Sequence, residues 1–331
     1  MSFSDLKKTF QVSRGFSYTY YTSPARESKP TLALFHGWPD SARLWTSLIN
    51  DYLVPNGYGI IAIDGLGFGD SSKPTDPSQY GWQHMTADVV EILDAEKLST
   101  VISLGHDWGS AMCQRFYHFY PSRVSGLAMI NAAYIPPSSA KFDLDLVNKL
   151  TEEAFGVGLY QYWHFFIADD APEIMKKNIE SVYAAAHGEP STWANIWTSA
   201  GGMRAFIEGG RTQQTLSYAT GDHKKDFLDR YGGDGPGFAA SNCWYKATQS
   251  GVQAQAEAKL PAERKVVNVP AFFWAVEDDY VCRPALIQSS IAEGLLPKLK
   301  IVSRSGGHWA LLERPAEFGE DILAWLKETF T

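Results

Sequence analysis

The stretch SLGHDWGSAMC, from Ser103 to Cys113, places a carboxylate at a point where chemistry is expected. Asp107 and its flanking glycines follow the spacing G-x-D-x-G, which is the nucleophile-elbow pattern G-x-S-x-G with aspartate in place of serine. A serine at this point attacks carbonyl carbons. A carboxylate is already ionised near neutral pH and needs no base to become a nucleophile. It suits attack on an sp³ carbon that carries a leaving group.

Three further stretches have the residue types that such a nucleophile needs. HGWPD (His36–Asp40) precedes the elbow, EDDY (Glu277–Tyr280) follows it, and GGHW (Gly306–Trp309) comes last. Each stands directly after an apolar run that predicts a buried strand. The order nucleophile, acid, histidine is typical of hydrolases whose nucleophile follows a strand of a parallel sheet. We therefore expect Asp107, a carboxylate of EDDY and His308 to meet at one edge of a sheet.

The elements that must position these residues alternate between short apolar runs and helical patterns, which is the signature of a parallel sheet covered by helices. The expected strands are Thr31–Gly37, Gly59–Gly65, Thr100–His106, Val124–Ala132, Ala271–Glu277 and Leu299–Ser303. The expected helices lie within Trp82–Leu98 and over Gly109–Tyr120, Pro284–Leu296 and Pro315–Phe330.

The pattern changes between residues 134 and 261, where aromatic-rich helical stretches follow one another without a clear strand. Glycine-rich breaks such as GGDGPG (Gly232–Gly237) separate them. We expect an α/β core formed by residues 1–133 and 262–331, interrupted by a helical lid at 134–261. Such an insertion would lie over the carboxyl ends of the strands, where open α/β sheets bind ligands.

Composition narrows the class of protein. The formal net charge of −8 argues against the basic face that a general binder of nucleic acid or acidic lipid needs. Cys113, Cys243 and Cys282 are odd in number and widely spaced, which predicts a reduced compartment, no disulfide framework and no Cys-x-x-Cys metal site. Apolar runs are too short for a signal peptide or a membrane span. We expect a soluble, cytoplasmic monomer or homodimer without a metal or cofactor.

With these motifs in place, the chain resembles the epoxide hydrolases of the α/β-hydrolase fold over nearly its whole length. The resemblance rests on the stretches HGWPD, DGLGFGDSSKP, GHDWG, CWYK, EDDYV and GGHW. It implies the motif Glu-x-Asp-aromatic-Val, which selects Asp279 over Asp278 as the acid. Some relatives place the acid after the preceding core strand. That neighbourhood holds Asn131 here, which is not a carboxylate.

The resemblance also implies two lid tyrosines that donate hydrogen bonds to the alkoxide of an opening epoxide. A phenol with a pKa near 10 can do this because it stays protonated at neutral pH. One match is Tyr245 in CWYK. The other lies in GLYQYWHFF (158–166), where Tyr162 has the better spacing and Tyr160 remains a rival.

The tetrahedral oxyanion of ester hydrolysis needs two hydrogen-bond donors. The backbone N–H of Trp108, directly after the nucleophile, is expected to be one, and Trp38 in the HGWP turn the other. A cis bond before Pro39 is compatible with that turn. The residues expected to line the substrate site are Trp38, Trp108, Tyr162 and Tyr245. His36 and His106 are expected to support the turn and the elbow rather than to react.

The expected activity is hydrolysis of an epoxide to a vicinal diol through an ester on Asp107, with His308 as the base for water. Haloalkane dehalogenases share the aspartate elbow and are the first alternative, but Trp38 after HG and the paired tyrosines favour epoxide hydrolysis. A binding protein that kept the fold and lost catalysis is the second alternative. The complete set of Asp107, Asp279 and His308 argues against it. The expected partner is a small-molecule epoxide, and neither nucleic acid nor a membrane.

Overall fold

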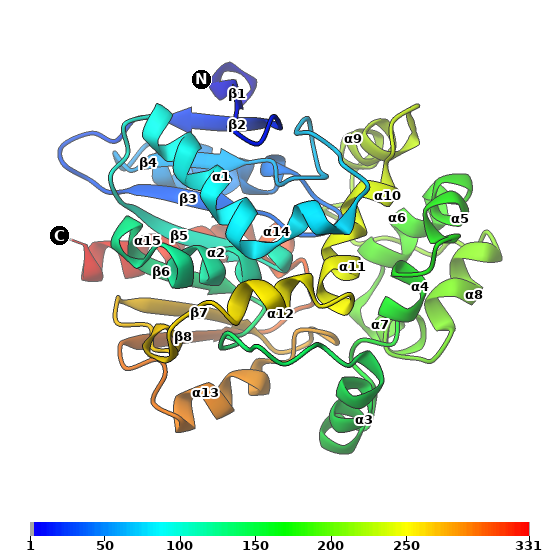
Figure 1. The fold of residues 1–331 in the computed structure, drawn as a ribbon. Helices are drawn as coiled ribbons and strands as arrows, with labels where there is room; N and C mark the ends of the chain where they lie inside the picture. Colours follow the sequence, from blue (N-terminus) through cyan, green and yellow to red (C-terminus); the bar gives the residue numbers. More distant parts are fainter. Residues whose placement is uncertain (1–2, 331) are drawn as a thin grey trace.

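The centre of the molecule is an eight-stranded sheet in a computed structural model that describes residues 3–330 (Figure 1). The strands are β1 (Lys7–Gln11), β2 (Ser17–Ser23), β3 (Thr31–Phe35), β4 (Gly59–Ile63), β5 (Val101–His106), β6 (Val124–Ile130), β7 (Ala271–Val276) and β8 (Leu299–Arg304). Their order across the sheet is β1-β2-β4-β3-β5-β6-β7-β8. β1, β2 and β4 pair antiparallel, whereas β3 to β8 run parallel to one another. The expected α/β fold with a mostly parallel sheet is confirmed.

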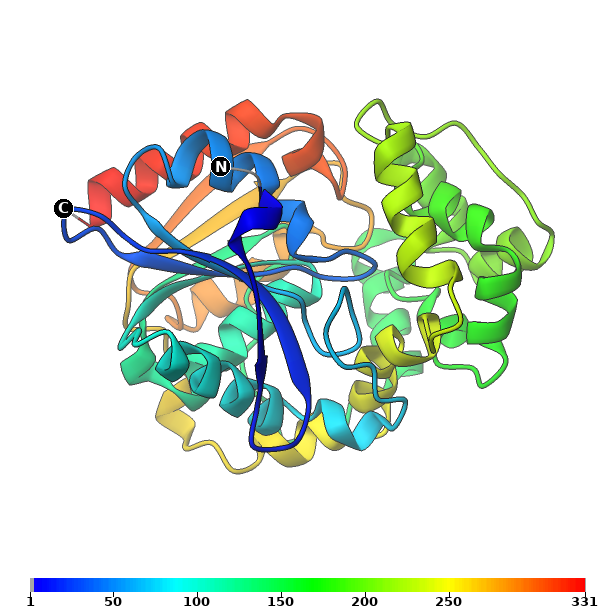
Figure 2. The same cartoon turned by 90° about the horizontal axis from the view of Figure 1, so that it is seen from above.

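Helices cover both faces of this sheet (Figure 2). Alternate side chains of a strand point to opposite faces. On β3, Leu32 and Leu34 pack in the same apolar cluster as Trp325, whereas Ala33 and Phe35 pack in the cluster of Met112. Because both faces are buried, the inner strands are largely apolar, and this is why they could be recognised in the sequence. The helices of the core are α1 (Trp82–Ala95), α2 (Trp108–Phe119), α13 (Gln288–Ala292), α14 (Ala310–Glu313) and α15 (Pro315–Thr329).

The segment between β6 and β7 is helical and gathers mostly on one side of the sheet layer (Figures 1 and 2). Its helices are α3 (Leu144–Phe155), α4 (Trp163–Phe166), α5 (Ala171–Lys177), α6 (Ile179–His187), α7 (Pro190–Ile196), α8 (Gly202–Glu208), α9 (Gly221–Gly232), α10 (Phe238–Ser241), α11 (Cys243–Gln249) and α12 (Val252–Glu257). The β-pairing within its described residues is an isolated bridge between Gly188 and Thr215. Across residues 3–330, no helix combines the length and the apolar character that crossing a bilayer requires.

The structure differs from the sequence predictions at three places. β1 and β2 were not predicted, because β1 is largely exposed and neither strand forms a continuous apolar run. The helix expected over Pro284–Leu296 is a 3₁₀ turn followed by the short α13, and the chain leaves the helix before Gly294, which has a positive φ of 71°. A π-helix at Leu48–Leu53 was also missed. Further 3₁₀ helices lie at Phe3–Leu6, Ala42–Trp45, Pro77–Tyr80, Pro121–Arg123, Ala262–Lys265 and Pro284–Ile287.

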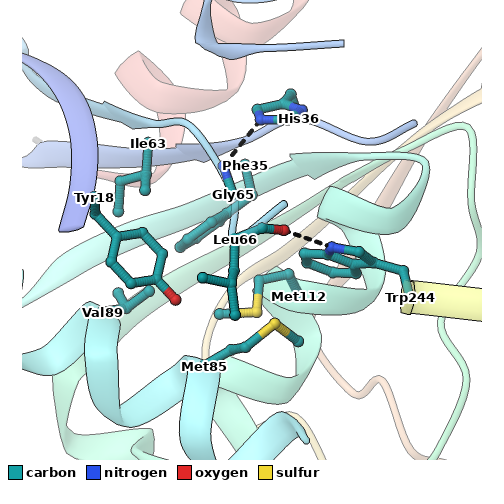
Figure 3. A pocket seen from close by; sticks show the side chains of 10 residues that line it. All are labelled: Tyr18, Phe35, His36, Ile63, Gly65, Leu66, Met85, Val89, Met112 and Trp244. Atoms are coloured by element: carbon teal, nitrogen blue, oxygen red, sulfur yellow. Dashed lines mark hydrogen bonds between the residues drawn. The ribbon is translucent and has the colours of Figure 1, made fainter. Parts of the chain in front are cut away.

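The loop after β4 links the core to the inserted helices (Figure 3). The N–H of Gly65 donates to His36 Nε2 at 3.0 Å, and the carbonyl of Leu66 accepts from Trp244 Nε1 on α11 at 2.9 Å. Since His36 Nε2 accepts, its Nδ1 carries the proton and donates to the carbonyl of Gly37 at 2.9 Å. Burial lowers the pKa of His36 to about 4, so the ring is neutral. This histidine therefore braces the turn after β3 against the loop after β4.

Candidate active site

Asp107 occupies a sharp turn between β5 and α2. Its φ of 55° and ψ of −125° lie outside the ordinary range of a non-glycine residue, so the surrounding structure must hold it there. A side-chain carbon on Gly105 would overlap the carbonyl of Gly109, and one on Gly109 would overlap the carbonyl of Phe35. The two glycines of the motif are thus required for the close approach of β5, α2 and β3. Together they present the carboxylate at the end of the strand.

One oxygen of this carboxylate is already held by the turn after β3. The N–H of Trp38 donates to Asp107 Oδ1 at 2.8 Å, across a turn in which the Trp38–Pro39 bond is cis. Gly37 must be glycine because a Cβ there would run into the Asp107 side chain. Burial raises the pKa of Asp107, while the charge of His308 and the N–H groups of Trp108 and Trp38 pull it back. The second oxygen, Oδ2, is the one nearest to His308.

His308 lies between two carboxylates. Its Nε2 is 3.7 Å from Asp107 Oδ2, and its Nδ1 is 2.7 Å from Asp279 Oδ2. Asp279 is fully buried, and its Oδ1 accepts the N–H groups of Val281 at 3.0 Å and Cys282 at 2.9 Å. Burial alone would raise the pKa of Asp279, but the charge of His308 and these hydrogen bonds outweigh it and hold the pKa below its usual range. The carboxylate therefore stays ionised beside the imidazole.

The neighbouring Asp278 has a different environment. Its Oδ2 accepts the N–H of Gly306 at 2.9 Å in an exposed position, and this bond ties the loop after β7 to the loop after β8. Of the two aspartates of EDDY, it is Asp279 that contacts His308. The structure thus brings together Asp107, Asp279 and His308 from the ends of three different strands, β5, β7 and β8.

Two tyrosines from the inserted segment lie close enough to Asp107 for its charge to act on their hydroxyl groups. Tyr162 immediately precedes α4, Tyr245 belongs to α11, and their ring centroids are 5.9 Å apart. Both are buried, and burial raises both pKa values well above 10, with the charge of Asp107 adding to the effect. Tyr160 packs against Trp163 with ring centroids 5.5 Å apart, and Asp107 makes the last of the contributions that raise its pKa. Tyr162 is thus the tyrosine of GLYQYWHFF that pairs with Tyr245.

The comparisons with known proteins fit this geometry. Residues 30–315 match the family described as alpha/beta hydrolase fold. The chain belongs to the α/β-hydrolase fold family. It is 26% identical over 307 residues to the rat (Rattus norvegicus) bifunctional epoxide hydrolase 2, covering 91% of this chain and 52% of that protein. The chain therefore spans about half the length of this relative and of its mouse and pig counterparts.

Two mycobacterial proteins match this α/β-hydrolase over nearly their full length. Epoxide hydrolase A of Mycobacterium tuberculosis is 25% identical over 302 residues, which cover 90% of each chain. The crystal structure of epoxide hydrolase A from Mycobacterium thermoresistibile superposes with a TM-score of 0.78 at 21% identity, covering 97% of this chain and 98% of that one. At this level of identity the structural likeness supports the fold.

Asn131, which the sequence excluded as the acid, and His106, which was expected to support the elbow, both contact His308 or its acid in this α/β-hydrolase. Asn131, at the end of β6 with φ of 61°, donates through Nδ2 to Asp279 Oδ2 at 2.9 Å and to the carbonyl of His308 at 3.1 Å. His106 Nε2 lies 2.9 Å from the same carbonyl, and burial lowers its pKa well below 6.5, so the neutral ring donates there. Because both contacts join distant parts of the chain, no local sequence pattern could have predicted them.

Aromatic rings enclose the triad of the α/β-hydrolase. The Trp108 ring packs edge-to-face on Tyr245 with centroids 5.0 Å apart, and the Trp38 ring packs on Phe166 at 4.6 Å. Trp193 of α7 packs against the imidazole of His308 at 5.2 Å. The inserted helices therefore supply a water-poor wall, in which electrostatic interactions with the carboxylate are stronger than in solvent.

One group of residues in the site has the donor atoms of a metal site. Asp279, Cys282 and His308 each offer an atom within 4.8 Å of the others. Two of these atoms, His308 Nδ1 and Asp279 Oδ2, already form a hydrogen bond at 2.7 Å. Burial raises the pKa of the Cys282 thiol well above 9. The donor set fits a histidine held by its acid better than it fits a metal ion.

Proposed function

We propose that the protein hydrolyses epoxides to vicinal diols through a covalent ester on Asp107. The observation that carries the proposal is the pairing of an elbow carboxylate with two buried phenols on one side and an imidazole 3.7 Å away on the other. This set combines a nucleophile that needs no base, donors for an alkoxide, and a base that is free to act on water. The names of the relatives, which are epoxide hydrolases, support the same activity.

In the first half-reaction Asp107 Oδ2 attacks a carbon of the epoxide ring. The new C–O bond forms as the ring C–O bond breaks, and the electron pair goes to the ring oxygen. Oδ1 stays on the N–H of Trp38 and becomes the carbonyl oxygen of the ester. The nascent alkoxide takes a proton from Tyr162 or Tyr245. Because burial raises both phenol pKa values well above 10, these donors stay protonated until the ring opens.

In the second half-reaction His308 Nε2 removes a proton from water, and the resulting hydroxide attacks the ester carbon. The negative charge moves onto Oδ1, where the N–H groups of Trp38 and Trp108 receive it. Collapse of this intermediate breaks the bond to the former Oδ2, and the departing alkoxide takes the remaining proton of the attacking hydroxide. The diol thus leaves with the former Oδ2, and the water oxygen remains in the ionised Asp107. Asp279 holds the imidazole through Nδ1 and stabilises its protonated form. The protonated His308 then gives its proton to the tyrosinate, which restores the neutral tyrosine and the neutral imidazole.

We further propose that residues 134–261 act as a lid over the core of residues 1–133 and 262–331. The lid supplies the two phenols, and its helices contact the core at several points. The contacts are Trp244 Nε1 to the Leu66 carbonyl, Glu257 to Arg115 and Gln253 to the Trp82 N–H. The substrate that fits is a small apolar epoxide, since aromatic rings line the site.

A single-turnover experiment in heavy-oxygen water tests the covalent route. Enzyme in excess over an aromatic epoxide should yield a diol whose new oxygen is unlabelled, and peptide mapping should find one labelled oxygen in Asp107. Label in the diol and none in Asp107 would mean direct attack by water, and the covalent mechanism would be wrong.

One observation favours haloalkane dehalogenation as a second candidate. The indole Nε1 of Trp38 is buried and makes no hydrogen bond within the part of the chain that the structure describes, so it could donate to a halide. Assays with chloro- and bromoalkanes beside the epoxides separate the two activities. Halide release without diol formation would replace the proposed activity with this one.

A further inference from the structure

We propose that Arg230 and Tyr231 of the lid position the oxyanion hole, by holding the turn whose Trp38 N–H receives the negative charge of ester hydrolysis. The inference rests on the proposed function and adds two positioning residues to it. Both residues lie near the end of α9. Neither contacts the triad in the hydrogen bonds of the described residues, so both act through the turn.

The two lid residues contact the carbonyl of Pro39, the residue that follows the oxyanion donor Trp38. Arg230 Nη1 donates to the carbonyl of Pro39 at 2.7 Å, and the hydroxyl of Tyr231 donates to the same oxygen at 3.1 Å. The preceding residue, Trp38, gives its N–H to Asp107 Oδ1 at 2.8 Å. The turn is closed by the N–H of Asp40, which donates to the carbonyl of Gly37 at 2.9 Å. The lid donors thus hold the Pro39–Asp40 peptide by its carbonyl, and the N–H of this peptide binds the carbonyl of the Gly37–Trp38 peptide, which carries the catalytic N–H.

The two lid donors are themselves held in place. Arg230 Nε pairs with Asp226 one helical turn earlier at 2.8 Å, and the arginine side chain is only 13% exposed. The other oxygen of Asp226 lies 3.4 Å from Arg43 Nε on the core. The Tyr231 ring stacks on Phe238 with centroids 4.4 Å apart and planes at 10°. Neither donor thus has to be ordered when the reaction occurs, which is what electrostatic preorganisation requires.

Charge strengthens the placement of the guanidinium. Asp40, in the same turn, is buried, and its Oδ2 has no hydrogen-bond partner among the described residues. Burial raises the pKa of Asp40 to about 7, and the charge of Arg230 acts in the opposite direction. The guanidinium therefore faces a carbonyl and a carboxyl of one turn, and its removal would leave both without their cationic neighbour.

The second oxyanion donor, the N–H of Trp108, does not depend on contacts from the lid. The N–H of Trp108 begins α2, and the elbow that aims it is built from β5, α2 and β3 of the core. One donor of the hole thus belongs to the core alone, whereas the turn of the other is held by His36 of the core and, in addition, by the lid. The consequence is that lid attachment and ester hydrolysis are coupled at Pro39.

The test compares ester formation with ester breakdown in single-turnover mixing, followed by intact-mass spectrometry. Arg230→Met should slow breakdown by about 10-fold, because misalignment of an oxyanion donor costs less than its removal, which is worth on the order of 10²–10³. Ester formation should slow less, so that more ester accumulates during the single turnover than in wild type. Arg230→Lys keeps a donor and should recover much of the breakdown rate. Tyr231→Phe should give a smaller slowing of the same step.

Arg204→Met is the matched control. Arg204 is also a lid arginine, and it pairs with Glu208 at i+4 and with Asp170, within the lid. It should leave the ratio of breakdown to formation unchanged. An equal ratio in wild type and Arg230→Met, or the same change in Arg204→Met, would overturn the inference. If Arg230→Met does not fold, Tyr231→Phe, which retains the ring stack, decides by the same ratio. Wild-type protein that forms no ester would instead overturn the proposed function itself.

Discussion

At the scale of single residues, the proposed mechanism gives His308 a different step from the one it would have beside a serine, because the elbow holds Asp107. A serine needs the imidazole for its first step, whereas an ionised carboxylate does not. The 3.7 Å between His308 Nε2 and Asp107 Oδ2 is longer than a hydrogen bond, as expected for a base that serves water rather than the nucleophile.

The first prediction follows for His308→Gln. The variant should open an epoxide and then stall, because neutral water attacks an ester poorly. Intact-mass spectrometry after mixing with a reactive epoxide should show one adduct of substrate mass, and peptide mapping should place it on Asp107. Asp107→Ala is the control and should form no adduct. A full rate of diol release by His308→Gln would contradict the assignment of the base.

The second prediction concerns Tyr245→Phe. Loss of one of two alkoxide donors should slow ester formation by up to about 100-fold, since a sole donor to an oxyanion is worth on the order of 10²–10³. The remaining donor, Tyr162, makes the decrease in the rate of ester formation smaller. Tyr58→Phe is a matched control, because its buried hydroxyl makes no hydrogen bond within residues 3–330 and it packs in the cluster of Trp325. Unchanged ester formation in Phe variants of Tyr245, Tyr162 and Tyr160 would exclude the tyrosines as donors.

The third prediction is a pH dependence of the ester fraction. Burial lowers the pKa of His308, but the charges of Asp279 and Asp107 outweigh it and raise the pKa above 6.5 in the free enzyme. In the ester Asp107 is neutral, so its contribution is lost and the pKa of His308 falls. Breakdown needs the neutral imidazole and is therefore lost as the pH falls through this lower pKa.

Ester formation needs an ionised Asp107, whose pKa is raised from 3.8 by burial. Rapid-quench measurements from neutral to mildly acidic pH should show the ester fraction increasing as the pH is lowered. The breakdown rate should report a lower pKa than a titration of His308 in the free protein by nuclear magnetic resonance. Equal pKa values in the two experiments would count against a neutral Asp107 in the intermediate.

At the scale of elements, the elbow depends on three segments that approach more closely than side chains allow. The fourth prediction is that Gly109→Ala destabilises the protein by about 2 kcal/mol or more, because the added carbon overlaps the carbonyl of Phe35 on β3. Gly221→Ala, at the start of α9, has open space around the added carbon and should be neutral or slightly stabilising. Urea unfolding of the two variants checks the difference, and equal stabilities would mean that the contact of α2 with β3 can relax.

The elements that the sequence predicted are those with a strong local signal. β3 to β8 of the parallel sheet could be located because their apolar runs end in glycine or polar residues, and α1, α2 and α15 because their spacing is helical. β1 and β2 lack such runs, and β1 is mostly exposed. The contacts of Asn131 with Asp279, and of Arg230 with Pro39, join positions 148 and 191 residues apart, so the sequence near either partner has no trace of them.

At the scale of the whole molecule, the proposed active site is assembled from two parts of the chain. The sheet supplies the triad from the ends of β5, β7 and β8, and the inserted helices supply the phenols and hold the turn after β3. The division is visible in Figure 2, where the inserted helices stand beside the sheet rather than within it. Substrate range could therefore change through the inserted helices while the chemistry of the triad is retained.

The position of β8 at the edge of the sheet has a consequence for the loss of activity by local unfolding. The loop that contains His308 follows this outermost strand, which is half exposed and has one neighbour in the sheet. Edge elements open locally before the inner strands do. Under the proposed mechanism, a molecule in which β8 has frayed would keep the nucleophile Asp107 and the phenols of Tyr162 and Tyr245 but lose the base His308. Such a molecule would form one ester with an epoxide and would not hydrolyse it, so that local unfolding at this edge would convert a catalyst into a protein that reacts only once.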